Sequence, residues 1–395
     1  MSLLGRPLLV LLTLLAVGLP VATALVWNRL GRRRVVRWSA RTALLVVTQL
    51  SAVLVAGAAL NDYGYFYGSW SELFAAGASS APVRTSGGPS RTAAAGGPAV
   101  VSTSGIRIVA DVGARTPAQW ARVGRTLAVR IFGAASQLAS PAYVWLPPQY
   151  FAPGRARAFP AVEVLGGYPG SALGLVRHMD YPGAVLAEVG AHRAAPVVLV
   201  MLRPAVVYPR DTECTNVPAG PQVETFLAQD LPAAIDAGLR VRPTAWGVMG
   251  DSTGGYCATK ITMDHFDRFR AGVALSGYFT ALHDRTTGDL WGGSSTLRHL
   301  NDLEWRLRHQ PPPPTSLFIA ISRDERGPNG YADTRRFLAL VHRPLQVTTM
   351  VLASGGHNFG SWGREMGPAI DWLSARLGGS VTAVTTSGPP ARAGR

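Results

Sequence analysis

Lysine and cysteine are scarce in this chain of 395 residues, which contains one lysine, Lys260, and two cysteines, Cys214 and Cys257. The lysine does not follow the glycine pattern of a Walker A loop, so a phosphate-binding site of that type is excluded. No cluster of histidine or cysteine has the spacing of metal ligands, so we expect no metal site.

Acidic residues are also few, with 23 against 38 basic residues and a net charge of +15. Six of the arginines lie within residues 28–41, and beyond residue 104 the excess falls to eight, with 29 basic and 21 acidic residues. No basic stripe with interleaved aromatic residues is present. We therefore do not expect nucleic-acid binding.

Two long apolar runs lie near the N-terminus, Pro7–Trp27 with 21 residues and Thr42–Leu60 with 19, and neither carries a charge. Each is close to the ~20 residues that cross a bilayer as a helix. A short arginine-rich loop such as residues 28–41 stays in the cytoplasm. We predict that residues 1–75 form a two-span transmembrane hairpin with both ends outside. A cleaved signal peptide, the alternative for the first run, fits the second run and the arginine loop poorly.

The composition changes again on both sides of the remaining sequence. Residues 76–104 are rich in Ala, Gly, Ser, Thr and Pro, which predicts a flexible linker. Residues 378–395 have a similar composition and predict a disordered tail. Residues 105–377 are left as one domain, which we expect on the extracytoplasmic side of the cell membrane.

One serine occupies a pattern that is typical of hydrolases. Residues 244–259 combine an apolar strand, a sharp turn and a helix, and the turn Gly250-Asp-Ser252-Thr-Gly254 is a G-x-S-x-G nucleophile elbow. The two glycines leave room where the strand and the helix approach each other. A serine hydroxyl alone is a weak nucleophile, so this interpretation requires a histidine base and an acid.

Candidate partners follow in the order serine, acid, histidine, which is the chain order of α/β-hydrolases. One apolar strand-like run ends just before Asp324 and Glu325, and the next leads into the glycine-flanked His357. Side chains beyond the carboxyl ends of such strands face the crevice that binds ligands. We predict Ser252 as nucleophile, His357 as base and Asp324 as acid, because the turn directly after the strand is the shortest route to the site. Glu325 is the alternative acid.

Acyl transfer also needs N–H donors for the oxyanion. The first is the N–H of Thr253, directly after the nucleophile. The second is expected in the loop Gly166–Gly170, which follows the apolar run Phe159–Leu165. Pro169 has no N–H to offer, so Tyr168 is the candidate. The alternative for this loop is an ordinary glycine-proline turn.

These motifs together resemble the esterase family that includes the antigen 85 mycolyltransferases and the feruloyl esterases. The resemblance covers residues 125–375 or so, and it rests on the elbow and on residues 223–232, 269–277 and 355–362. It implies an α/β-hydrolase fold, a mostly parallel sheet with helices on both faces, and a triad at Ser252, Asp324 and His357. The loop 166–169 lacks the aspartate and arginine of the mycolyltransferase loop, so we expect little transfer to trehalose.

Two further expectations concern the same domain. An oxidising compartment favours a disulfide between Cys214 and Cys257, and two separate buried thiols are the alternative. Residues 278–314 form an unusually long connection between two core strands, which predicts a segment that covers the serine or a purely structural insertion.

The sequence therefore predicts a membrane-anchored, outward-facing serine esterase or acyltransferase. Its substrate would be a small-molecule or lipid ester, such as a cell-envelope lipid or an acyl sugar, and a Ser-acid-His mechanism needs no cofactor. A serine peptidase is the enzymatic alternative. A non-catalytic envelope-binding or adhesion module is the alternative of another class, because a fold alone does not fix a function.

Overall fold

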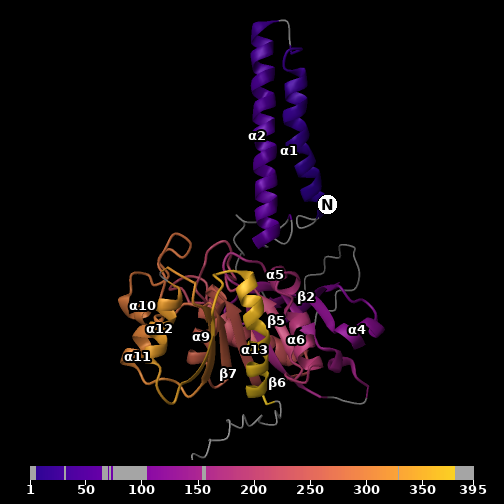
Figure 1. The fold of residues 1–395 in the computed structure, drawn as a ribbon. Coiled ribbons are helices and arrows are strands. Elements are labelled where there is room, and N and C mark those ends of the chain that lie inside the picture. The colour runs from indigo at the N-terminus through magenta and orange to yellow at the C-terminus, as the bar shows by residue number, and fades with distance from the viewer. Residues whose placement is uncertain are drawn as a thin grey trace, which may run out of the picture.

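Two long helices and an α/β domain make up the computed structural model (Figure 1). It describes residues 6–30, 33–64, 70, 73, 105–153, 157–327 and 329–378. The expected linker at 76–104, and the expected tail beyond residue 378, lie outside the described residues.

The N-terminal helices α1 (Arg6–Val26) and α2 (Arg34–Gly64) lie side by side as a hairpin. Each is long and apolar enough to cross a membrane, and few of their side chains are buried. Helix α2 begins at Arg34, so much of the predicted loop 28–41 is helical. The reason is local: no glycine or proline interrupts the chain from Arg34 to Ala56.

The larger domain is built on one nine-stranded sheet with the order β1-β2-β3-β5-β4-β6-β7-β8-β9. The strands are β1 (Ile106–Val112), β2 (Arg125–Phe132), β3 (Ala139–Leu146), β4 (Phe159–Leu165), β5 (Val198–Leu202), β6 (Val241–Asp251), β7 (Phe269–Leu275), β8 (Ser316–Ser322) and β9 (Gln346–Leu352). Strands β1, β2 and β3 pair antiparallel, β3 pairs antiparallel with β5, and β4 to β9 are parallel. The predicted α/β fold is confirmed.

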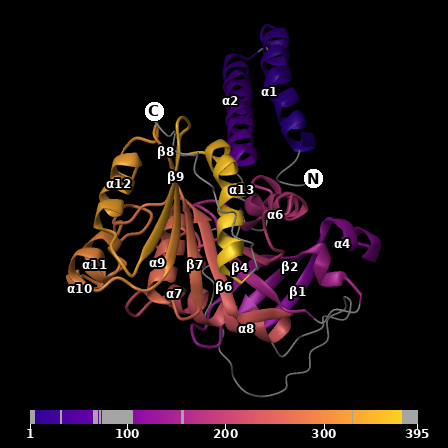
Figure 2. The same cartoon turned by 60° about the horizontal axis from the view of Figure 1, so that its bottom comes forward.

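Helices cover both faces of this sheet (Figures 1 and 2). They are α4 (Pro117–Val123), α5 (Ala172–Arg177), α6 (Tyr181–Gly190), α7 (Val223–Thr225), α8 (Leu231–Gly238), α9 (Thr253–Asp264), α10 (Ser295–Leu300), α11 (Leu303–His309), α12 (Tyr331–Leu340) and α13 (Phe359–Arg376), with a 3-10 turn at Pro148–Phe151 and a π-helical turn at Phe226–Asp230. One core cluster joins the sheet to α8, α9, α11 and α12, and a second joins it to α5, α6 and α13.

The central strands β4 and β5 are apolar except for Glu163, because they are buried on both faces. Every residue of β4 and β5 is buried, as is typical of strands in the middle of an α/β sheet. The parallel strands end at one edge, where β6 stops at Asp251, β8 at Ser322 and β9 at Leu352. The loops that carry the predicted triad therefore leave the sheet side by side.

Candidate active site

Ser252 lies at a sharp turn between β6 and α9, with a left-handed φ of 53° and a ψ of −121°. Glycine is needed around it for a physical reason. A Cβ atom at Gly254 would collide with the carbonyl oxygen of Leu165 in β4, and one at Gly250 would collide with the backbone of Gly254. The predicted elbow thus has the close strand-to-helix geometry that its glycines indicate.

His357 bridges the serine and a buried carboxylate. Its Nε2 lies 2.8 Å from Oγ of Ser252, and its Nδ1 lies 2.5 Å from Oε1 of Glu325. The other oxygen of Glu325 accepts a hydrogen bond of 2.8 Å from Oγ of Ser276. With Nδ1 donating to Glu325, Nε2 is free to accept the serine proton, which is the arrangement of a catalytic triad.

The carboxylate beside His357 is Glu325, whereas the sequence analysis favoured Asp324. Glu325 is 5% exposed, but the Asp324 side chain is exposed to solvent. The turn after β8 explains the difference: the N–H of Glu325 donates to the carbonyl of Ser322 at 3.2 Å, which turns its side chain inward. Asp324 instead accepts a long 3.4 Å hydrogen bond from the N–H of Gly355. The distance along the chain from the end of β8 therefore does not tell which of the two acids contacts His357.

The two expected oxyanion donors flank the serine. Thr253 is the first residue of α9, so its N–H has no partner within the helix, and the positive end of the helix dipole favours an anion there. Tyr168 lines the same cavity as Ser252. Its loop is tied to the elbow, because the N–H of Gly167 donates to Oδ2 of Asp251 at 2.9 Å.

Asp251 is a site residue that the sequence analysis missed. Its side chain is 2% exposed, and its Oδ1 has no hydrogen-bond partner among the described residues. Burial raises the pKa of Asp251 to about 7, while the hydrogen bond from Gly167 and the charge of His357 oppose the rise. The sequence indicates such a residue, because Asp251 stands directly between an apolar strand and the nucleophile.

A second buried acid lies near the triad on α13. Glu365 has no hydrogen-bond partner for either carboxylate oxygen among the described residues. Burial raises the pKa of Glu365 to about 8, and the negative charge of Glu325 adds to the rise. The acid is therefore largely uncharged at neutral pH, which avoids two adjacent negative charges behind His357.

A cavity of about 240 Å³ opens beside the serine and the histidine. Its walls come from the oxyanion loop, α5, the start of α13 and the end of α2. They are Leu60, Gly166, Gly167, Tyr168, Pro169, Gly170, Ser171, Gly174, Leu175, Met179, Asp251, Ser252, His357, Phe359 and Trp362. None of residues 278–314 is among them, so the expected cover of the serine by that segment is not found. That segment instead carries α10 and α11, on the opposite side of the sheet from α13.

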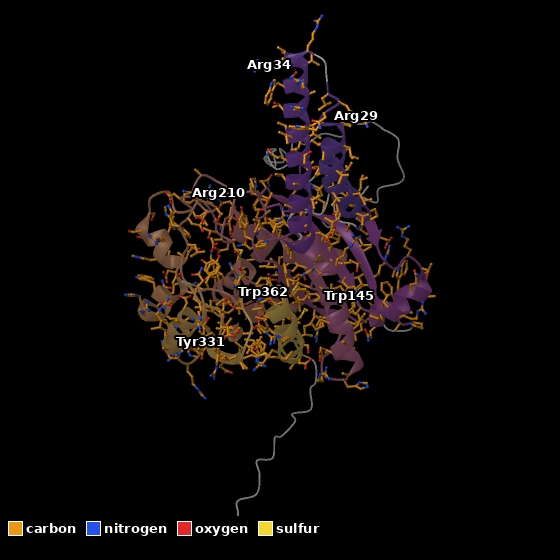
Figure 3. The ribbon with its side chains drawn as sticks, turned by 45° about the horizontal axis from the view of Figure 1, so that its top comes forward. Arg29, Arg34, Trp145, Arg210, Tyr331 and Trp362 are labelled. Atoms are coloured by element: carbon orange, nitrogen blue, oxygen red, sulfur yellow. A yellow bond between two sulfur atoms is a disulfide. The ribbon has the colours of Figure 1, made fainter. Side chains whose placement is uncertain are left out.

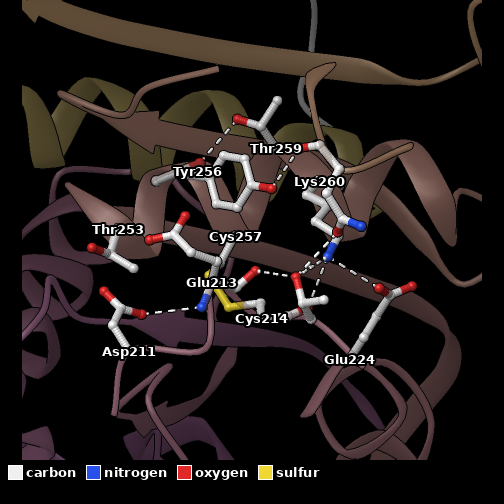
Figure 4. The surroundings of a disulfide bond; sticks show 12 residues. Asp211, Glu213, Cys214, Glu224, Thr253, Tyr256, Cys257, Thr259 and Lys260 are labelled. Atoms are coloured by element: carbon white, nitrogen blue, oxygen red, sulfur yellow. Dashed lines mark hydrogen bonds and ion pairs between the residues drawn. A yellow bond between two sulfur atoms is a disulfide. The ribbon is translucent and has the colours of Figure 1, made fainter. Parts of the chain in front are cut away.

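A disulfide joins Cys214 to Cys257, with Cα atoms 5.7 Å apart, and links a loop to the helix that follows the serine (Figure 4). The buried Lys260 strengthens this link, because its Nζ donates to the carbonyl of Cys214 at 3.0 Å and pairs with Glu224 at 3.1 Å. The loop is thus fixed against α9 at two neighbouring points.

Comparison with known proteins gives a family and a fold. Residues 138–366 match the model of the Esterase family, described as Putative esterase. No curated protein matches the chain.

The following three are among the solved structures that are similar to this chain. An S-formylglutathione hydrolase from Agrobacterium tumefaciens has a TM-score of 0.56 and 14% identity over 69% of this chain and 99% of that one. A ferulic acid esterase has a TM-score of 0.54 and 15% identity over 65% and 99%. The fluorophosphonate-binding serine hydrolase F of Staphylococcus aureus has a TM-score of 0.51 and 15% identity over 64% and 98%. Such identities show a shared fold, while the family model spans more than half of the sequence. The chain therefore belongs to the esterase family and is a carboxylic ester hydrolase with an α/β-hydrolase fold.

Proposed function

We propose that the protein is a membrane-anchored serine esterase in which Ser252, His357 and Glu325 form the catalytic triad. The observation that carries the proposal is the continuous pair of hydrogen bonds from Ser252 through His357 to Glu325, at 2.8 and 2.5 Å. A nucleophile, a base within reach of its proton and a buried group that orients the base are the three parts that such catalysis requires.

The chemistry then follows from the geometry. Oγ of Ser252 attacks the ester carbonyl while Nε2 of His357 takes the hydroxyl proton, and the carbonyl oxygen becomes an oxyanion held by the N–H groups of Tyr168 and Thr253. Collapse breaks the ester bond, and His357 returns the proton to the departing alkoxide. The carboxylate of Glu325 stabilises the imidazolium in both steps.

A second round removes the acyl group from the enzyme. Water gives a proton to His357 as it attacks the acyl-enzyme. Collapse then breaks the bond to Oγ of Ser252, His357 returns the proton to that oxygen, and the free acid leaves. An alcohol in place of water makes the same site an acyltransferase. The oxyanion loop 166–169 has no charged side chain to hold a sugar, which favours water as the acceptor.

The membrane part of the proposal rests on α1 and α2. Both have the length and apolar character of spanning helices, and their side chains are largely exposed. Arg29 and Arg34 lie at the end of the hairpin that is remote from the hydrolase domain (Figure 3). Arginines in a short loop are retained in the cytoplasm, so the hydrolase domain would face outward.

A fluorophosphonate probe tests the proposed triad. The probe phosphonylates a serine only when a base activates the hydroxyl, so a non-catalytic envelope-binding module would not react. We expect one adduct in the full-length protein, located on Ser252 by peptide mass spectrometry and lost in His357→Ala. No adduct on the folded protein, or an adduct on another serine, would contradict the proposal.

A paired substrate assay addresses the peptidase alternative. An ester and an amide with the same acyl group are compared under the same conditions. We expect the ester to be cleaved and the amide to be left largely intact. Faster cleavage of the amide would replace the esterase proposal by a peptidase.

A further inference from the structure

The C-terminal end of α2 meets the hydrolase domain (Figures 1 and 2). It does so at the cavity that contains the serine. Leu60 is one of the cavity's lining residues, and the next residue, Asn61, is 8% exposed although it lies at the end of a long exposed helix. The charge of Asp62 also acts on His178 of the hydrolase domain. The end of the helix is therefore packed against the domain beside the site.

The apolar part of α2 ends at the same residue. Thr42–Leu60 carries no charge, and its 19 residues extend about 28 Å at 1.5 Å per residue. The hydrocarbon core of a bilayer is about 30 Å thick. Leu60 would thus lie at the outer boundary of the hydrocarbon, with Asn61 and Asp62 among the headgroups, and the cavity would lie at the surface of the outer leaflet.

The cavity is too small for a long acyl chain. Its volume of about 240 Å³ lies below the ~300–1,000 Å³ of sites that enclose a whole drug-sized ligand. Its walls near the serine include the apolar side chains of Leu175, Met179 and Phe359, which suit methylene groups. Leu60 is 60% exposed, so a chain that leaves the cavity there passes onto the lipid-facing surface of α2.

We propose that α2 is part of the substrate site: Leu60 forms the mouth of an acyl-binding cavity, and the substrate is a membrane lipid ester whose acyl chain enters from the outer leaflet. This rests on the proposed function, because Ser252 is the residue that cleaves the ester. The anchor then keeps the enzyme at the membrane and also selects substrates that already lie in the bilayer.

The test uses the full-length protein in phospholipid vesicles with two substrates, p-nitrophenyl acetate and p-nitrophenyl palmitate. Leu60→Trp narrows the mouth. Val53→Trp is the matched control, because Val53 lies two turns earlier on α2, is 67% exposed and does not line the cavity. We expect Leu60→Trp to lower kcat/KM for palmitate by about tenfold or more relative to its effect on acetate, since a misfit in an apolar pocket changes this ratio by about 10- to 200-fold. Val53→Trp should change neither.

A second measurement avoids dependence on one bulky substitution. Leu60→Cys would introduce the only unpaired thiol, because the two natural cysteines are joined. Labelling Ser252 with a long-chain phosphonofluoridate should slow the reaction of this thiol with maleimide, and a methyl analogue should not. Equal thiol reactivity after both reagents would overturn the proposal.

Ser252→Ala in the same vesicles separates the two hypotheses. If it retains esterase activity, the proposed function fails. If it loses both activities but Leu60→Trp affects acetate and palmitate equally, the esterase stands and entry past Leu60 is wrong. A loss in Leu60→Trp that is about tenfold or more larger for palmitate than for acetate supports entry of the acyl chain past Leu60.

Discussion

At the scale of single residues, the account depends on how Glu325 holds His357. The carboxylate is buried and bonded on one side to the histidine and on the other to Ser276, so it has little freedom to rotate away. The side chain of Asp324 is exposed, and it accepts a long hydrogen bond of 3.4 Å from the N–H of Gly355. Glu325 and Asp324 are neighbours in one turn but differ in burial and contacts. Substitutions at the two positions can therefore be compared as a matched pair.

We expect Glu325→Gln to lower kcat by about 10⁴-fold, because an amide favours the wrong histidine tautomer and cannot stabilise the imidazolium. Asp324→Asn should change kcat by less than about threefold, as exposed substitutions do. Steady-state hydrolysis of a p-nitrophenyl ester gives both values. The opposite ranking would return the acid role to Asp324.

The choice of the acid could not be predicted from the sequence, although the serine and the histidine could. Ser252 and His357 could be located because the glycines around each indicate a turn at the end of a strand. The choice between Asp324 and Glu325 depended on which way a four-residue turn points its side chains. That direction is set by the hydrogen bond from Glu325 N–H to Ser322, which no sequence pattern displays. The sequence does show Asp251 as an acid between an apolar strand and the nucleophile, but its burial follows from packing that the sequence does not display.

Glu365 predicts a pH dependence of stability. Its pKa is raised from 4.5 to about 8 in the folded protein, so between these values the folded state holds a proton that the unfolded state has lost. Stability should therefore fall as the pH rises from about 5 to 8, by about 1.4 kcal/mol for each pKa unit that separates the two states.

Glu365→Gln removes this titration. Thermal unfolding measured from pH 5 to 9 should show a flatter pH dependence for the variant, which becomes more stable than the natural protein at the alkaline end. Asp324→Asn, at an exposed acid, is the control and should follow the natural protein. A slope in Glu365→Gln as steep as in the natural protein would show that other groups cause the loss.

At the scale of elements, the nucleophile helix α9 is braced by the loop that carries Cys214. The disulfide closes a loop of 43 residues, and Lys260 from the same helix binds the loop carbonyl. Tyr278, after β7, donates to Glu213 of this loop at 2.5 Å and lies 3.3 Å from Oγ1 of Thr253. These contacts help to fix the position of Thr253, and with it the direction of its N–H.

We expect the double variant Cys214→Ser with Cys257→Ser to lose about 4 kcal/mol of stability, the chain-entropy value for a loop of this length. Denaturant unfolding of the variant should match that of the natural protein under reducing conditions. If reduction leaves the natural protein's unfolding midpoint unchanged, the cysteines are not paired in solution.

Elements were easier to predict than their contacts. The apolar runs before the elbow and before His357 became the parallel strands β6 and β9. Strand β6 lies inside the sheet and is mostly buried, as its apolar run indicates, whereas β9 is an edge strand with no buried residue. The segment 278–314 was expected to cover the serine or to be a structural insertion. It carries α10 and α11, and α11 packs in the core cluster that lies on the face opposite α13. A long insertion has no periodic signal that tells which face of a sheet it will cover.

At the scale of the whole molecule, the helical hairpin packs against the hydrolase domain beside the serine cavity. Arg29 and Arg34 lie at the end of α1 and α2 that is remote from the hydrolase domain (Figure 3). The serine cavity lies at the opposite end of α2, because Leu60 lines it. If the arginine end is cytoplasmic, the cavity is held at the outer surface of the membrane. The orientation of the hairpin in the membrane therefore decides on which side of the membrane the serine cavity lies.

A pair of exposed serines tests this orientation. In intact cells, the thiol of Ser39→Cys near the arginine end should resist an impermeant maleimide, whereas that of Ser295→Cys on α10 should react. Both should react after permeabilisation. Labelling of Ser39→Cys in unbroken cells, with protection of Ser295→Cys, would invert the topology.

The central claim is that Ser252 performs the chemistry, and the kcat of Ser252→Ala measures it most directly. The natural protein and the variant are compared in hydrolysis of p-nitrophenyl butyrate, with thermal unfolding as a check that both are folded. The account predicts unchanged unfolding and a loss of kcat of about 10⁶-fold, as for other serine triads. A folded variant that keeps more than about one hundredth of the activity would contradict the account.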